Sequence, residues 1–325
     1  MHVLVTGATG FLGGHVADRL LARGHTVRAL LRPGRAAESL VARGVETCVG
    51  DLSDERSLKA ACRDVDGLVH CAERVGGGSR QEGEQHRINV EGSSALYRAA
   101  RKVRTARIVH VSSAATVGCN KDGAVLDETT PWVGRDRPKL HYVTTKRESE
   151  ERALAAARAG LPILAVNPAV TIGPGLDLGS AQGPVASALA GARRVPKGGG
   201  SVSDVADVTE GIVLALEQGR VGERYILGGH NLTWRELSEA ARRQAGRAGR
   251  VREYPNALGR ALASGMTVLD AARLARPSLA PERFRAWGWF TFVDSSKAQR
   301  ELGYTVRPLA EILARACSRT GVPTP

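Results

Sequence analysis

A glycine-rich turn near the N-terminus constrains the fold of this chain more than any other feature. Residues 2–6 form a short apolar run, and a helical pattern of apolar residues begins at Phe11. The sequence TGATGFLG, residues 6–13, joins the two and spaces its glycines as GxxGxxG. A strand, such a turn and a helix in this order predict the first βαβ unit of a parallel sheet.

The three glycines of this turn predict a binding site for a dinucleotide. Gly7 permits the tight turn, and Gly10 lets the main chain approach a pyrophosphate whose charge the helix N-terminus stabilises. Gly13 lets the helix pack closely on the sheet. A second strand begins 13 residues after Gly13, as this unit requires. The loop residues that we expect to bind the cofactor are Gly7, Thr9, Gly10, Phe11 and Leu12.

The following residues extend this unit into an α/β fold. Over the first 170 residues, short apolar runs alternate with longer helical patterns, as in a doubly wound parallel sheet. The predicted strands are 2–6, 26–31, 45–49, 67–71, 107–111 and 162–166. The predicted helices lie near 11–23, 35–43, 54–63, 85–103 and 141–159. Beyond residue 170 the pattern loosens, with a strand predicted at 225–227 and a helix at 234–243.

Two domains are predicted from this change of pattern. Residues 1–168 would form a Rossmann-type dinucleotide-binding domain, to which 204–228 returns. Residues 169–325 would form mainly a smaller, mixed substrate-binding domain. Five of the thirteen aromatic residues fall between 284 and 292. We interpret this cluster as a buried strand of the smaller domain, because aromatic residues favour strands; the alternative is the lining of an apolar pocket.

The end of the second predicted strand indicates a preference for NADP(H). Enzymes that use NAD usually have a carboxylate there, which holds the ribose hydroxyls. In this chain the position is Leu31, followed by Arg32, with Arg35 nearby. Guanidinium groups suit the 2′-phosphate of NADP(H), with NAD(H) as the alternative cofactor. The competing interpretation of Arg32 is that it stacks on the adenine or faces solvent.

Asp51 and Leu52, after the third predicted strand, form the next part of the expected cofactor site. A carboxylate at this edge of the sheet could bind the adenine amino group. The alternative is that Asp51 or Ser53 caps the helix that follows, as short polar side chains often do.

Tyr142 and Lys146 form the predicted acid–base pair. They stand four residues apart in a helical pattern, so their side chains share one helix face. A free tyrosine has a pKa of about 10, and a cation one turn away stabilises the phenolate and lowers that pKa. A hydroxyl donor is expected at the end of the preceding strand, where Ser112 and Ser113 stand. Both serines could instead be ordinary turn residues.

These segments together resemble the extended short-chain dehydrogenases/reductases, within the NAD-dependent epimerase/dehydratase superfamily. The resemblance covers essentially the whole chain. It is carried by TGATGFLG at 6–13, HCA at 70–72, NVEG at 89–92, VSSAATVG at 111–118, YxxxK at 142–146, NP at 167–168, DVADV at 204–208 and DSSKA at 294–298. VRALLRP at 27–33 and SSAATV at 112–117 resemble the dihydroflavonol-reductase-like and 3β-hydroxysteroid-dehydrogenase-like branch most, although hopanoid-associated sugar epimerase-like proteins share much of the pattern.

The resemblance implies roles for individual residues. Ser113 would be the catalytic serine, and Lys146 would bind the nicotinamide ribose. Asn89 would support a water molecule in a proton relay. Ala72 and Pro168 would line the dinucleotide.

The predicted function is reversible hydride transfer between NADP(H) and a carbonyl carbon, which interconverts a ketone or aldehyde and an alcohol. Tyr142 would exchange the proton, and Ser113 would hydrogen-bond the carbonyl oxygen. The first alternative is a sugar-nucleotide epimerase or dehydratase with tightly bound NAD. Val117 disfavours it, because the family usually has a tyrosine there, in a region that positions such substrates. The second alternative is a non-catalytic dinucleotide sensor, which would not need the catalytic side chains.

Composition argues against several other classes of protein. The 46 basic residues, 39 of them Arg, are spread along the chain without the aromatic interleaving of a nucleic-acid site, despite a net charge of +13. The cysteines form no CxxC pair and the histidines no HxxxH pair, so we expect no metal. No apolar run reaches the roughly 18 residues of a membrane span, and no signal peptide precedes the first strand. We therefore expect a cytoplasmic protein with a small-molecule substrate; a homodimer is compatible with the sequence.

Overall fold

Seven strands form the largest sheet of the computed structural model, which describes the chain except at 75–81, 133–139, 177–183, 272–281 and 318–325. The strands are β1 (His2–Thr6), β2 (Thr26–Leu31), β3 (Glu46–Val49), β4 (Gly67–His70), β5 (Arg107–Val111), β6 (Ile163–Pro168) and β10 (Arg224–Leu227). They lie in the order β10-β6-β5-β4-β1-β2-β3, and every pairing is parallel. The order 3-2-1-4-5-6 is that of a doubly wound Rossmann sheet, so the predicted fold class is confirmed.

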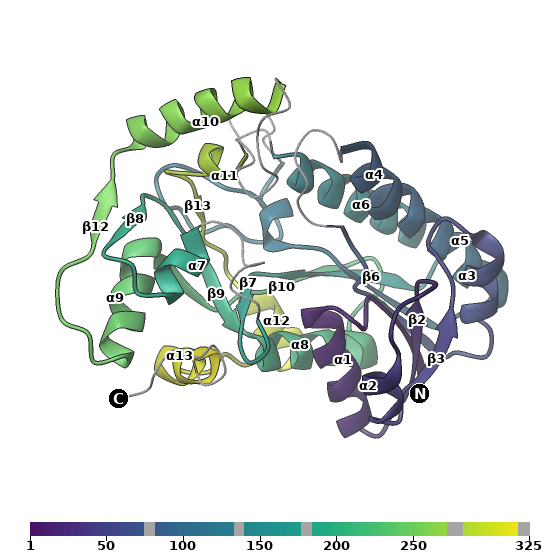
Figure 1. The fold of residues 1–325 in the computed structure, drawn as a ribbon. Coiled ribbons are helices and arrows are strands. Elements are labelled where there is room, and N and C mark those ends of the chain that lie inside the picture. The colour runs from purple at the N-terminus through teal and green to yellow at the C-terminus, as the bar shows by residue number, and fades with distance from the viewer. Residues whose placement is uncertain (75–81, 133–139, 177–183, 272–281, 318–325) are drawn as a thin grey trace.

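Helices cover both faces of this sheet (Figure 1). One face carries α1 (Phe11–Ala22) and α8 (Val205–Gln218), and the other carries α3 (Glu55–Ala61), α5 (Ser93–Val103) and α6 (His141–Arg158). Successive side chains of a strand point to opposite faces. Val3 and Val5 therefore pack in the core beside α1, whereas Leu4 packs in the core beside α3 and α5. Burial on both faces explains why these strands are continuous apolar runs in the sequence.

Most predicted elements are observed within one or two residues of their predicted bounds, and three observations need comment. β6 extends to Pro168 because β10 pairs with it up to that residue. The helix predicted at 35–43 is reduced to α2 (Glu38–Val41). The helix predicted near 85–103 is confirmed but starts earlier, at Glu82, and it contains a π-helical segment (Arg87–Gly92) between α4 (Glu82–His86) and α5. Such π-helical turns often occur at functional sites.

The second part of the structure is built on shorter sheets. β7 (Val170–Ile172), β11 (His230–Thr233) and β13 (Phe290–Thr291) each pair with β9 (Gly199–Asp204), and β8 (Arg194–Pro196) pairs with β12 (Arg252–Tyr254). The helices here are α7 (Pro184–Leu189), α9 (Trp234–Gln244), α10 (Asn256–Ala271), α11 (Glu282–Arg285), α12 (Ser296–Leu302) and α13 (Leu309–Cys317). A capping box of Thr233 and Glu236 begins α9, which confirms the helix predicted at 234–243. The division into two domains stays a prediction.

The aromatic cluster is only in small part the buried strand that the sequence predicts. Phe290 is buried in β13, but Trp287 and Trp289 are half-buried and lie outside this two-residue strand. The strand cannot start earlier because Gly288, with φ +82°, turns the chain in the left-handed conformation. Trp287 instead stacks on Tyr254 of β12, with 5.7 Å between the ring centroids.

Helices that could cross a membrane are absent from the described part of the chain, since none there combines the necessary length with the necessary apolar composition.

Candidate active site

A cavity of about 400 Å³ lies at the carboxyl ends of the strands in the large sheet. The glycine loop, the ends of β2 and β3 and the segment after β4 line it. The predicted cofactor-binding residues in its wall are Gly7, Thr9, Gly10, Phe11, Leu12, Arg32, Asp51, Leu52 and Ala72. The strand order reverses between β1 and β4, which is where open α/β sheets bind their ligands.

Close main-chain contacts explain why two loop positions are glycine. Gly7 has φ +74°, and a Cβ atom there would lie 2.8 Å from the main-chain nitrogen of Ala72. A Cβ atom on Gly13 would lie 2.2 Å from the carbonyl oxygen of Gly7. Because both positions lack a side chain, the N-terminus of α1 can form part of the cavity wall. Its free N–H groups and dipole favour an anion there.

Asp51 lies in the cavity wall as an ionised acceptor. Its Oδ1 atom accepts hydrogen bonds from the main-chain nitrogen of Ser53, at 2.9 Å, and from the Ser53 hydroxyl. These hydrogen bonds, and then the charges of Arg32 and Arg87, hold the pKa of Asp51 below its usual range. A carboxylate in this state can accept a hydrogen bond from an amino group.

The alternative in which Asp51 or Ser53 caps α3 is wrong. Asp54 is the N-cap, because its side chain accepts a hydrogen bond from the main-chain nitrogen of Arg56 at 3.1 Å. The helix therefore begins one residue later than predicted, and this leaves Asp51 at the edge of the cavity.

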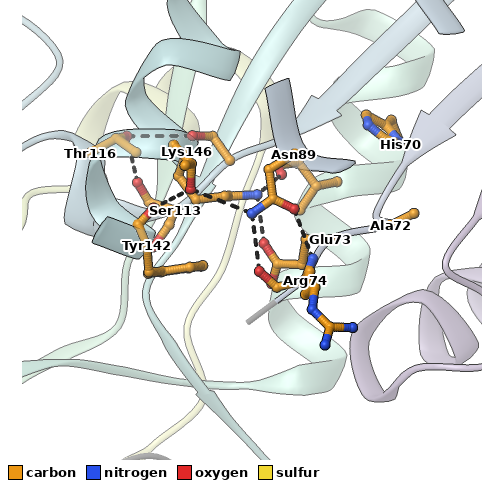
Figure 2. Close-up of polar contacts among 12 residues, drawn as sticks. His70, Ala72, Glu73, Arg74, Asn89, Ser113, Thr116, Tyr142 and Lys146 are labelled. Carbon is orange, nitrogen blue, oxygen red and sulfur yellow. Dashed lines mark hydrogen bonds and ion pairs between the residues drawn. The ribbon is translucent and has the colours of Figure 1, made fainter. Parts of the chain in front are cut away.

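Ser113, Tyr142 and Lys146 lie together beyond the segment after β4 (Figure 2). Ser113 follows β5 and caps the short 3-10 helix 114–116, since its hydroxyl accepts from the main-chain nitrogen of Ala115 at 3.2 Å. It also lies close enough to Tyr142 on α6 to lower the pKa of that tyrosine. Lys146, one turn further along α6, is buried and donates to the carbonyl oxygen of Val111 at 2.7 Å. The turn role and the hydroxyl-donor role of Ser113 are therefore compatible.

Glu73 is a member of this group that the sequence analysis did not identify. One carboxylate oxygen lies 2.8 Å from the Lys146 ammonium, and the side chain also lines the cavity. The one available signal was position, because Glu73 follows Ala72 at the carboxyl edge of β4. Glu73 therefore connects the cavity to the candidate catalytic side chains.

The electrostatics around Tyr142 differ from the expectation that Lys146 lowers its pKa. Burial raises the pKa of Tyr142 well above its ordinary value, the negative charge of Glu73 raises it further, and the side chain of Ser113 lowers it. Glu73 neutralises Lys146, so this lysine does not dominate the environment of the tyrosine. Tyr142 is consequently protonated at neutral pH.

Asn89 is held by the main chain of the segment that carries Glu73. The main-chain nitrogen of Arg74 donates to Asn89 Oδ1 at 2.8 Å, and Asn89 Nδ2 donates to the carbonyl oxygen of Arg74 at 3.0 Å. Asn89 itself is buried in the π-helical segment. Both ends of its amide thus fix the position of residues 73–74, whereas its implied role beside a relay water stays a prediction.

A second residue that the sequence did not reveal is a buried carboxylate on α6, which lies next to the candidate catalytic residues. Glu150 is fully buried, one turn after Lys146. It accepts hydrogen bonds from the hydroxyls of Ser112 and Thr116 and from the amide of Asn167, at 2.7 Å in the last case. Its other oxygen lies 2.9 Å from the guanidinium of Arg224 on β10. Glu150 therefore ties α6 to the ends of β5 and β6 and to β10.

Comparison with known proteins identifies the family. The model of the NAD dependent epimerase/dehydratase family matches residues 3–228. The chain belongs to this family. Sterol demethylase protein B of Methylococcus capsulatus is 37% identical over 72% of this chain and 71% of its own. A 4-hydroxy-2-methyl-3-oxo-4-farnesyl-3,4-dihydroquinoline-1-oxide ketoreductase of Stigmatella aurantiaca is 31% identical over 94% of this chain and 92% of its own.

Solved structures agree with this assignment. A nucleoside-diphosphate-sugar epimerase from Pseudomonas aeruginosa superposes with a TM-score of 0.76 at 28% identity and covers 97% of this chain and 96% of its own. Dihydroflavonol 4-reductase and 3β-hydroxysteroid dehydrogenase, after which the expected branch is named, are also among the relatives. The chain is therefore an NAD(P)-dependent enzyme of the extended short-chain dehydrogenase/reductase type, and the sensor alternative is set aside.

Two further expectations from the sequence concern Pro168 and a metal ion. Pro168, which the resemblance places along the dinucleotide, is the last residue of β6 and lies outside the wall of the 400 Å³ cavity. Within the described residues, no three His, Cys, Asp or Glu side chains cluster in a way that could hold a metal ion.

Proposed function

We propose that this enzyme reduces a ketone or aldehyde with NADPH, or oxidises the corresponding alcohol with NADP⁺. The observation that supports this most is that one cavity and the candidate catalytic residues adjoin each other. Arg32 and Glu73 both line the cavity, and Glu73 forms an ion pair with Lys146. The Stigmatella ketoreductase and the Methylococcus sterol demethylase protein favour an apolar ketone as substrate.

The residues of the cavity fit a nicotinamide dinucleotide. The glycine loop and the N-terminus of α1 would hold its pyrophosphate. Arg32 and Arg35 would pair with a 2′-phosphate, and Asp51 would accept a hydrogen bond from the adenine amino group. When bound, the dinucleotide supplies or accepts the hydride.

The proposed catalytic side chains transfer the proton. Tyr142 carries its proton at neutral pH, so it can give this proton to a carbonyl oxygen as negative charge develops there. Ser113 would hydrogen-bond the same oxygen. Lys146 supplies the positive charge that stabilises the tyrosinate left behind, provided that Glu73 does not cancel this charge.

The surroundings of Val117 support a reductase over a sugar-nucleotide epimerase. Val117 is buried and packs with Ala114, Ile226 and Val293 in a small apolar cluster. It offers neither a hydroxyl nor an exposed ring to a sugar at the position where the family usually has tyrosine. Val117 therefore supplies no polar group of the kind that a tyrosine would supply there.

Cofactor exchange and substrate choice test the proposed function. The protein is purified without added cofactor, its bound ligand is identified, and NADPH consumption is followed with a panel of apolar ketones and of sugar nucleotides. We expect little retained cofactor and a ketone-dependent loss of NADPH absorbance. Stoichiometric NAD⁺ that survives purification, together with interconversion of a sugar nucleotide and no ketone-dependent loss, would favour the epimerase instead.

A further inference from the structure

Glu73 lies at the junction between the cavity and the catalytic group, and the reaction described above gives it no role. Its side chain is 30% exposed, whereas that of Lys146 is only 5% exposed. The Lys146 ammonium already contacts the Val111 carbonyl oxygen and the Glu73 carboxylate. The cation that would hold the nicotinamide ribose is therefore paired with an anion of the protein itself (Figure 2).

Few other groups near Lys146 change charge around neutral pH. His70 on β4 and His110 on β5 are buried, and burial lowers the pKa of His70 to about 3 and that of His110 well below its ordinary value. Burial likewise raises the pKa of the Cys71 thiol to about 12. These three groups stay neutral, so among the described residues near Lys146 we take Glu73 and Tyr142 as the groups whose charge it responds to.

The segment that carries Glu73 is fixed on both sides. Asn89 holds the main chain of Arg74 by two hydrogen bonds. The Arg74 guanidinium lies 3.2 Å from a carboxylate oxygen of Glu84 on α4. The fixed main chain therefore places the Glu73 side chain next to Lys146. The Glu73 carboxylate also lines the cavity, which suits a polyanion.

We propose that Glu73 is a positioning residue that occupies Lys146 in the ligand-free enzyme and yields this lysine when a dinucleotide binds. The inference rests on the proposed function. Before binding, the carboxylate adds to the effect of burial in raising the pKa of Tyr142, and it opposes the negative charge of the incoming ligand. After the carboxylate withdraws, Lys146 is free to stabilise the tyrosinate. Dinucleotide binding and the proton affinity of Tyr142 are thereby coupled.

Dinucleotide affinity gives the first test. We expect Glu73→Gln to bind NADPH and NADH more tightly than the wild type, by roughly five-fold or more, because one negative charge leaves the cavity wall. Glu84→Gln is the matched control, since it removes an equal charge nearby but does not touch Lys146. Titration calorimetry measures both affinities. Unchanged or weaker binding by Glu73→Gln, or an equal gain in Glu84→Gln, overturns the inference.

Phenolate absorbance in the ligand-free protein gives the second test. The contribution of Tyr142 is isolated by subtracting the titration of a matched Tyr142→Phe protein. We expect this contribution to titrate at lower pH in Glu73→Gln than in wild type, and Glu73→Asp, which keeps the charge, to return it toward the wild-type midpoint. An unchanged midpoint in Glu73→Gln overturns the inference. Neither test uses turnover, so a failure of the proposed reaction would be detected separately, in the ketone and sugar-nucleotide panel.

Discussion

Tyr142 is the residue on which the proposed chemistry depends most directly. Tyr142→Phe keeps the ring but removes the exchangeable proton, so we expect kcat to fall by about 100-fold or more. The dinucleotide dissociation constant should change by only a few-fold, because Tyr142 is absent from the cavity wall formed by the glycine loop. Steady-state kinetics and calorimetry measure the two quantities. A variant that retains a tenth of the wild-type kcat would show that another group exchanges the proton.

Arg32 is the residue that we propose to set cofactor preference, at the same scale. We expect the wild type to bind NADPH more tightly than NADH, by about ten-fold or more, because a charge-assisted phosphate contact contributes roughly 1.5–3 kcal/mol. Arg32→Ala should narrow this difference mainly by weakening the binding of NADPH. Lys121→Ala is a suitable control, because it removes a cation that stacks over Trp289, outside the cavity. Equal affinities for the two cofactors in the wild type would refute the assignment of Arg32.

At the scale of the element, α6 carries two of the proposed catalytic residues and a buried anchoring carboxylate in three successive turns. Tyr142 and Lys146 face the site, and Glu150 anchors the same helix face in the core. We expect Glu150→Gln to lower the free energy of unfolding by about 3 kcal/mol, because Arg224 would keep a buried charge without its counter-ion. Urea denaturation measures this loss.

The surface pair on the same helix provides the control for Glu150. Glu151 pairs with Arg147 through a carboxylate that is 56% exposed. Exposed pairs of this kind contribute less than about 1 kcal/mol, so Glu151→Gln should leave stability nearly unchanged. Equal losses in the two variants would mean that the buried network around Glu150 does not anchor α6.

At the scale of the whole molecule, the sequence predicts the layered sheet much better than the details of the site. Strands buried on both faces must be apolar throughout, and β1, β2 and β5 start and end at the predicted residues for this reason. The π-helical segment could not be predicted, because its apolar pattern in the sequence is the same as that of an α-helix. Its packing beside α6 is a tertiary contact that the pattern does not show.

The sequence could point to the proposed catalytic trio and to the glycine loop because each rests on a fixed spacing within short segments. Glu73 and Glu150 have no such local signal. The contacts of Glu150 come from β5, β6 and β10, and those of Glu73 come from a helix more than 60 residues away. A single carboxylate in a sequence does not reveal partners that only the tertiary fold brings together.

The late position of β10 in the chain has a consequence for biosynthesis. Arg224, the counter-ion of Glu150, is made after every other strand of the large sheet and well after α6 itself. A ribosome-bound fragment that lacks this strand would expose the edge of β6 and leave a buried carboxylate without its cation. An interrupted translation product would therefore be a substrate for proteases, and catalytic competence would appear only once synthesis had passed residue 227.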